Sequence, residues 1–292
     1  MIQYIKRKDL DILKYDVCIE NSIQSRIYGF SWYLDIVADN WDVMVLDDYK
    51  AVMPIPWKSK YGLKYISQPY FCQQLGVFSK EKFTKEIQEE IIKKIPKKFV
   101  KVSLNFNSDN FLTSNMKPLK NYILILNNTY DTLFKAFSKG RKHAVKVGQK
   151  NQLLLNKTTI SELIDMKKEF YAHGNFPIIV LEKLTNYVLE NNKGFILGVF
   201  KDGSLIGGGL FLKSKNRITY LFSSFNMDGR KLQAASFLIS NIVKKYENSN
   251  AILDFEGGNL PNIGSFFKSF SSKDEGYSHL NYINIISLFK KS

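Results

Sequence analysis

The chain has 292 residues, of which 45% are hydrophobic and 14% are aromatic, enough for one large folded domain or two of ordinary size. No stretch approaches the roughly 18 uncharged apolar residues of a membrane span. The charges at residues 6–9 exclude a secretory signal peptide, so we expect a cytoplasmic protein. The net charge of +15 favours anionic partners, such as nucleotide phosphates, tRNA or, peripherally, an anionic membrane face. A lysine-rich composition alone explains the bulk charge equally well.

Cysteines and histidines are few and widely spaced. Cys18 and Cys72 form no CxxC pair, and we expect both to be buried, reduced thiols. The histidines, His143, His173 and His279, lack the close spacing of metal ligands. The sequence therefore predicts no metal site, and His173 is expected to end a helix.

In the first half, short apolar stretches of alternating or β-branched character predict strands. These strands are expected at residues 41–46, 51–56, 64–67, 99–106 and 122–126. One helix is expected within residues 25–39. A second is expected to begin at Ser79 as N-cap and to end at Pro96. The polar and aromatic loop that contains Gln68, Tyr70, Gln73 and Gln74 is a candidate wall for an acceptor substrate.

The second half repeats this order with clearer signals. It opens with a basic helix at residues 131–149, and the Asp202-Gly203 pair predicts a β-hairpin turn. Asn259 is expected to cap a short helix with Pro261 in its first turn. The other expected strands are 153–155, 194–200, 205–212, 217–222, 251–256 and 282–286, and the other helices are 161–171, 181–191 and 229–246.

Both halves thus contain the order strand, turn, strand, strand, helix, strand. This pattern predicts a duplicated α/β unit, with domains at residues 1–128 and 129–292 and a boundary in the polar stretch 127–129.

Three segments of the second half resemble a known superfamily. The hairpin, strand, helix and strand of residues 194–256 resemble the core of the GNAT N-acyltransferases. The segment 253–270, which opens with Leu-Asp-Phe-Glu-Gly-Gly, and the basic segment 137–150 resemble the FemABX branch. The resemblance implies an α/β (α+β) fold of two GNAT-like units in tandem, each a mixed, mainly antiparallel sheet flanked by helices. It also implies a bacterial acyl- or aminoacyltransferase whose second unit is catalytic and whose first is degenerate.

GNAT enzymes bind the pyrophosphate of coenzyme A on a loop of pattern Gln/Arg-x-x-Gly-x-Gly/Ala before a helix. Arg230 and Ala235 match this pattern, whereas Gln233 replaces its glycine. Gly229, Arg230 and Lys231 still offer a phosphate positive charge and the free N–H groups of a helix start. The donor is therefore expected to be acyl-CoA (acetyl-CoA) or, as in FemABX enzymes, aminoacyl-tRNA. A solvated helix start remains the structural alternative.

The basic helix adds a second group of cations. Lys139, Lys142 and Lys146 share one helical face, and Arg141 and Lys150 lie close by in sequence without any carboxylate. This pattern predicts contacts with phosphates of a nucleotide or of tRNA. We include Arg141 and Lys142 among the candidate donor-binding residues.

Asp254 and Glu256 are candidate catalytic residues. Residues i and i+2 of a strand point to one face, so both carboxylates are expected near the strand's carboxyl end, where α/β folds bind ligands. A carboxylate there accepts a proton from an attacking amine. The structural alternative is that Asp254 binds the turn at Gly257 and that Glu256 pairs with a lysine.

Residues on the neighbouring strand complete the candidate site. Tyr220, Ser223 and Ser224 are expected to line a cleft that opens where this strand diverges from the one carrying Asp254. The three glycines at 207–209 leave room for a substrate arm or mark a bulge.

Three functions follow as hypotheses. The first is acyl transfer from acyl-CoA to an amine of a small molecule, glycan or peptide in cell-envelope metabolism. The second is FemABX-like transfer from aminoacyl-tRNA, and the third is a non-catalytic binding protein with the same fold.

Overall fold

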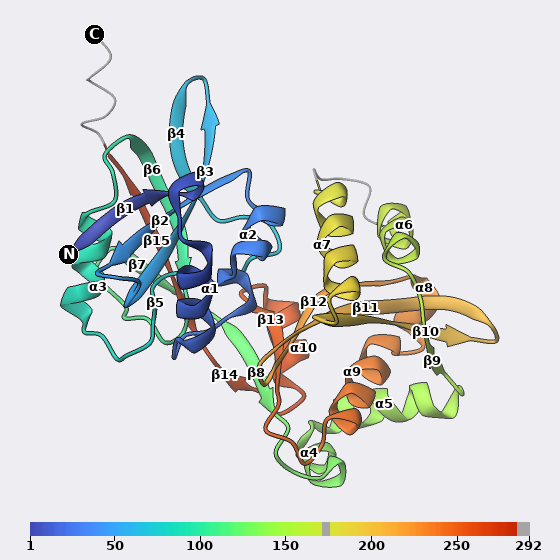
Figure 1. The fold of residues 1–292 in the computed structure, drawn as a ribbon. Helices are drawn as coiled ribbons and strands as arrows, with labels where there is room; N and C mark the ends of the chain where they lie inside the picture. The colour runs from blue at the N-terminus through green and yellow to red at the C-terminus, as the bar shows by residue number, and fades with distance from the viewer. Residues whose placement is uncertain (171–175, 285–292) are drawn as a thin grey trace. The chain divides into compact units, whose positions relative to one another are not determined.

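The computed structural model describes residues 1–170 and 176–284, and it divides them between two α/β units (Figure 1). Met1–Leu119 and the segment from Gly276 onward form the first unit, and Lys120–Glu275 form the second. The expected boundary between residues 128 and 129 differs from this division at two strands. Residues 121–125 pair within the second sheet, and residues 277–283 pair within the first.

The first unit is built on a sheet of order β1-β2-β3-β4-β6-β15-β7, with β5 beside β3. Its strands are β1 (Ile2–Lys6), β2 (Asn40–Leu46), β3 (Ala51–Lys60), β4 (Leu63–Ser67), β5 (Phe78–Ser79), β6 (Phe99–Phe106), β7 (Met116–Leu119) and β15 (Tyr277–Ile283). Its helices are α1 (Ile12–Asn21), α2 (Ser31–Val37) and α3 (Lys85–Lys93), with 3-10 turns at Arg7–Asp9 and Ile27–Gly29.

The second unit is built on a sheet of order β14-β8-β13-β12-β11-β10-β9. Its strands are β8 (Asn121–Ile125), β9 (Leu154–Asn156), β10 (Gly194–Lys201), β11 (Ser204–Ser214), β12 (Arg217–Phe225), β13 (Ile252–Gly258) and β14 (Lys273–Asp274). Its helices are α4 (Tyr130–Ala136), α5 (Lys139–Lys150), α6 (Ile160–Phe170), α7 (Ile178–Glu190), α8 (Met227–Lys231), α9 (Ala234–Lys245) and α10 (Pro261–Lys268).

Apart from β5, which pairs with β3 and has no counterpart among the described strands of the second sheet, the two sheets correspond strand for strand, which confirms the predicted fold of two tandem units. In the first, the antiparallel run β1-β2-β3-β4 is followed by β6, which is parallel to β4. In the second, the run β9-β10-β11-β12 is followed by β13, which is parallel to β12. In each unit an antiparallel strand then pairs with this parallel strand: β15 pairs with β6, and β8 pairs with β13. β8 precedes the segment β9–β13 in the sequence, and β15 follows the whole second unit. Neither strand therefore belongs to the repeated segment of its own unit.

Several expected helix starts are wrong by a few residues. Ser79 does not cap a helix but pairs with Ala51 in the sheet, and α3 begins after Thr84, whose side chain accepts the N–H of Ile87. Likewise, Leu260 rather than Asn259 occupies the N-cap of α10.

Two expected long helices are each broken into two. The basic helix splits into α4 and α5 because Ser138 starts a new helix, accepting the N–H of Arg141. The helix expected at residues 229–246 splits into α8 and α9 at Gln233, whose φ of 62° lies in the left-handed region. His173 lies outside the described residues.

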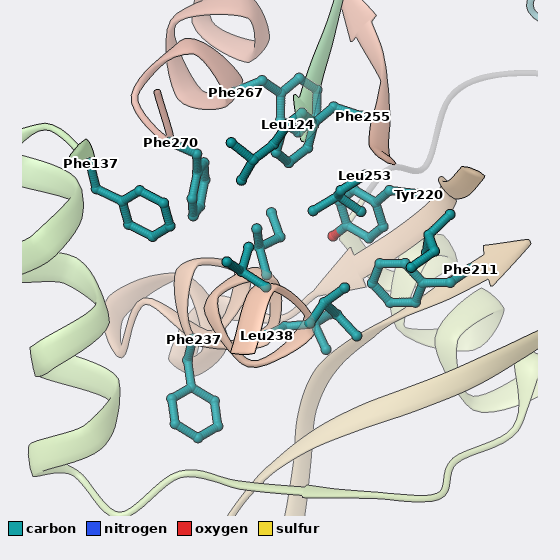
Figure 2. Close-up of a cluster of buried hydrophobic side chains, with 14 of the residues drawn as sticks. Leu124, Phe137, Phe211, Tyr220, Phe237, Leu238, Leu253, Phe255, Phe267 and Phe270 are labelled. Carbon is teal, nitrogen blue, oxygen red and sulfur yellow. The ribbon is translucent and has the colours of Figure 1, made fainter. Parts of the chain in front are cut away.

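The core of the second unit is rich in aromatic rings (Figure 2). Phe255 of β13 stacks on Phe267 of α10 with ring centroids 4.7 Å apart, and Phe211 stacks on Tyr220 at 4.9 Å. The Tyr220 ring occupies the space beside Gly209, where an added Cβ would lie 2.6 Å from it. Aromatic side chains rather than a substrate arm thus fill the space that this glycine leaves.

In the parts of the chain that the structure describes, every helix is too short or too polar to cross a membrane. Cys18 and Cys72 are buried free thiols, as expected.

Candidate active site

The site begins where two parallel strands of the second unit separate. β12 pairs with β13 at only three positions, Arg217 with Ile252, Ile218 with Leu253 and Thr219 with Asp254. Beyond Thr219, β12 continues to Phe225 beside β11 alone. This finding confirms the expected divergence, and it leaves one edge of β12 without a ladder partner among the described strands.

A cavity of about 280 Å³ lies along this part of β12. Its walls come from the end of β12, the junction of α8 with α9, and α10. The lining residues are Ser223, Ser224, Phe225, Gly229, Arg230, Gln233, Ala235, Ser236 and Phe266. None of these described residues is acidic, so the wall suits an anionic group.

The start of α9 forms part of the wall. The first N–H groups of a helix have no partner within the helix and carry its positive dipole end. The N-cap residue, Gln233, makes no side-chain cap with them. Glycine adopts this left-handed backbone more readily than any other residue does. The replacement of glycine by Gln233 has therefore not abolished the turn that exposes these amides.

Ser224 also lines the cavity, but its hydroxyl lies elsewhere. Ser224 pairs with Gly208, whose Cβ position faces Leu163 of α6, so its side chain lies on the face of the sheet opposite α9. The residue is only 3% exposed, and its Oγ atom has no hydrogen-bond partner among the described residues.

Arg141 of α5 lies behind the wall as a cation without a carboxylate partner among the described residues. Its Nε donates to Ser269 Oγ at 2.9 Å, and a second guanidinium nitrogen donates to Ser236 of the cavity wall. The guanidinium carbon lies 4.1 Å from the centroid of the Phe266 ring and 4.7 Å from that of Phe270. Burial lowers the pKa of Arg141 to about 10, so the group stays charged at neutral pH. An anion in the cavity would compensate this charge.

Tyr220 is linked to the cavity through Ser223. Burial raises the pKa of the Tyr220 hydroxyl well above its usual value, while a hydrogen bond with Ser223 acts in the opposite direction. At neutral pH Tyr220 is therefore protonated, and it can donate a proton but cannot act as a base.

Asp254 is fully buried and its two oxygens are already engaged. It accepts hydrogen bonds from Arg217 at 2.7 Å, from Asn121 Nδ2 at 2.9 Å and from the N–H of Glu256 at 3.0 Å. Arg217 also forms two hydrogen bonds with Glu275. Burial alone would lower the pKa of Arg217, but the two carboxylates outweigh it and raise the pKa. This network holds the strands together at the point of divergence.

The expectation that Asp254 and Glu256 point to the same side is wrong. Glu256 has a φ of 52°, and the pairing of β13 with β8 skips from Asp254 to Gly258. This bulge takes Glu256 out of the strand's alternation and leaves it half-buried. Glu256 is not among the residues that line the cavity.

The structure brings most of the expected donor-binding residues together. Ser223, Ser224, Gly229, Arg230 and Ala235 all line the cavity, and Arg141 contacts its wall.

Two expected donor-binding residues lie elsewhere. Lys231 is exposed and absent from the cavity lining, and Lys142 donates from Nζ to the carbonyl of Lys135 at 3.0 Å. The sequence also did not identify Ser236 and Phe266, because a pattern within one segment says nothing of which helices converge on it.

The fold that carries these features is FemABX-like and GNAT-like. The sequence matches no family model and no curated protein. A crystal structure of FemX has a TM-score of 0.70 to this chain at 11% identity, covering 99% of this chain and 100% of that chain.

Two further solved structures share the fold. A conserved protein of unknown function from Bacteroides thetaiotaomicron has a TM-score of 0.60 at 10% identity, with 96% of this chain and 99% of that chain covered. L-PGS from Bacillus licheniformis has a TM-score of 0.55 at 11% identity, with 94% of this chain and 92% of that chain covered.

Proposed function

We propose that this protein transfers an acyl or aminoacyl group from an activated, phosphate-bearing donor to an acceptor amine. The observation that carries the proposal is the divergence of β12 from β13 beside a cavity bounded by the start of α9. The free edge of β12 can donate a backbone N–H to the donor carbonyl, as an oxyanion hole does. The start of α9, together with Arg230 and Arg141, would hold a phosphate of the donor.

In the proposed reaction, the amine nitrogen attacks the donor carbonyl carbon, and Glu256 accepts the proton that the amine loses, directly or through water. The bond to the leaving thiolate or ribose oxygen then breaks. Tyr220, hydrogen-bonded to Ser223, stays protonated because burial raises the pKa of its hydroxyl, and it stabilises the departing group as a hydrogen-bond donor. The leaving group then takes up the proton that Glu256 accepted from the amine, directly or through water. The protein forms no covalent intermediate.

Two donors fit this scheme. Acyl-CoA, for example acetyl-CoA, is supported by the left-handed backbone at Gln233, which keeps the shape of a phosphate-binding turn. Aminoacyl-tRNA is supported by the likeness to FemX over nearly the whole chain and by the exposed lysines of α5, among them Lys139, Lys146 and Lys150. The acceptor we propose is an amine of a small molecule, glycan or peptide of cell-envelope metabolism, modified in the cytoplasm. The protein would reach membrane-bound acceptors by peripheral contact.

Isothermal titration calorimetry with acetyl-CoA, and separately with aminoacyl-tRNA, tests the proposal. We expect saturable binding of one donor, and Arg230→Gln should weaken it about tenfold, the loss of one charged hydrogen bond. Lys183→Gln, which removes an exposed charge of α7, serves as the control. Binding of neither donor would instead support a non-catalytic protein with this fold.

A further inference from the structure

The first unit contains a larger cavity, of about 490 Å³, at the end of the sheet where β2 begins. Its lining combines aromatic rings with a cluster of lysines. Lys6 comes from the end of β1, Lys64 from the start of β4, and Lys98 from the residue before β6, with Trp57 of β3 between them. A volume of this size is typical of a site for a small molecule.

These lysines have no carboxylate partner among the described residues. The Lys64 ammonium lies 4.3 Å from the centroid of the Trp57 ring, and the Lys98 ammonium lies 4.3 Å from that of Tyr4. Burial lowers the pKa of Lys98, and although Asp42 raises it, Lys64 and Lys6 lower it further. Lys64 and Lys6 therefore each lie close enough to Lys98 to repel its ammonium group.

The acidic residues of the cavity already have partners. Asp42, only 7% exposed, accepts hydrogen bonds from Trp57 Nε1 at 2.9 Å, from the N–H of Arg7 at 2.9 Å and from the Tyr4 hydroxyl.

The same holds for the other two carboxylates of the lining. Asp35 forms a bidentate pair with Arg7, and Asp39 pairs with Lys58. Asp35 and Asp39 are thus paired with cations, and the remaining carboxylate, Asp42, whose hydrogen-bond donors are neutral, offsets only part of the charge of the three lysines.

We propose that this cavity binds a phosphate group of a small molecule between Lys6, Lys64 and Lys98. Lysine binds phosphate as a point charge, and a dianion placed among three ammonium groups would relieve their mutual repulsion. The site lies wholly within the first unit and is separate from the donor cavity of the second.

Tryptophan fluorescence gives a direct readout, because the three tryptophans of the chain, Trp32, Trp41 and Trp57, all belong to the first unit. Titration of the full chain with inorganic pyrophosphate, at constant ionic strength, should change the emission saturably as Lys64 is drawn from the Trp57 ring. Vesicles containing phosphatidic acid form a second arm. A response to pyrophosphate assigns a soluble ligand, and a response to these vesicles alone assigns a lipid headgroup.

The double variant Lys64→Gln/Lys98→Gln should weaken the binding at least tenfold, whereas Lys93→Gln, an exposed lysine of α3, should leave it unchanged. Arg141→Met, at the donor cavity, should also leave it unchanged. Two results would overturn the proposal: no saturable response in either arm at millimolar phosphate, or equal affinity in the double variant. Circular dichroism checks that each variant is folded, and Lys64→Arg, which keeps the charge, should retain most of the affinity.

Discussion

Replacing Arg141 with methionine should weaken donor binding without weakening the fold. The guanidinium is largely buried against Phe266 and Phe270 with only hydroxyl partners, and no described carboxylate compensates its charge. Methionine keeps the length of the side chain and packs favourably against aromatic rings. The substitution therefore removes the charge while it preserves most of the packing.

The substitution should weaken donor binding, whereas it should leave the stability of the fold unchanged or raise it slightly. A hydrogen bond to a charged group contributes about 1.5–3 kcal/mol, so losing it should weaken donor binding by roughly tenfold to a hundredfold. The lowered pKa of Arg141 shows that the folded state disfavours its charge. Since solvent still reaches part of the group, removing that charge should stabilise the fold by only about 1 kcal/mol or leave it unchanged.

Calorimetric titration with the donor and urea denaturation, applied to Arg141→Met and to the wild type, measure both effects. Lys183→Gln is the matched control, because it removes an exposed positive charge of the same unit. A variant that binds donor with wild-type affinity but unfolds more easily would show that Arg141 is structural, and would refute the reasoning.

Four further outcomes are expected. Glu256→Gln should lower turnover about 10²- to 10⁴-fold with little change in the donor dissociation constant, measured by steady-state kinetics and calorimetry. Gln233→Gly should stabilise the protein by about 0.5–1 kcal/mol in urea denaturation, because glycine adopts the left-handed backbone without steric cost. Arg217→Met should destabilise it by about 3–5 kcal/mol because it leaves buried Asp254 unpaired, and a second change, Asp254→Leu, should recover part of the loss. Arg141 loses its charge as pH rises through about 10, so donor affinity should fall towards that pH. Donor binding at a pH just below 10 should be accompanied by uptake of a proton, which calorimetry in buffers of different ionisation enthalpy measures.

Each of these expectations has a contradicting result. Unchanged turnover in Glu256→Gln would remove it as the base, and a destabilised Gln233→Gly would show that the Gln233 side chain stabilises the turn. If Arg217→Met unfolds at the wild-type urea concentration, the buried ion pairs contribute no net stability. Donor binding without proton uptake just below pH 10 would place the anion away from Arg141.

Much of the fold followed from local patterns. The strand at residues 99–106 matches β6 residue for residue, and the hairpin turn at Asp202-Gly203 joins β10 to β11 as expected. These elements depend on alternation and turn chemistry that adjacent residues specify. The strand at the C-terminal end could not be assigned to the first sheet, because its pairing with β6 and β7 joins residues more than a hundred positions apart.

The site was predictable to the same extent. The residues at 223–235 were identified because they lie within one short segment, and the structure places most of them on one cavity wall. The partners of Asp254 were not identified, because Arg217 and Asn121 reach it from two separate segments, and Glu275, which pairs with Arg217, comes from a third. The same-face expectation for Glu256 failed because a bulge interrupts the strand, and no residue in that segment indicated it.

The two units differ at the strand edge on which the proposed chemistry depends. In the first unit, the edge of β6 beyond its pairing with β4 is closed by the returning loop. The N–H of Asn105 donates to Gln68 Oε1 at 2.9 Å, and Leu75 forms two backbone hydrogen bonds with β6 and the residue after it. The loop that contains Gln68, which was expected to line an acceptor site, thus completes this sheet, and its role towards an acceptor stays a prediction.

In the second unit, no described segment pairs with the edge of β12 that faces β13 beyond Thr219. The duplicated architecture has therefore filled the gap between its parallel strands in one copy and kept it in the other. An unpaired strand edge inside a sheet costs stability unless something binds it. That cost, together with the charge of Arg141 that no described carboxylate compensates, is what a bound donor would relieve.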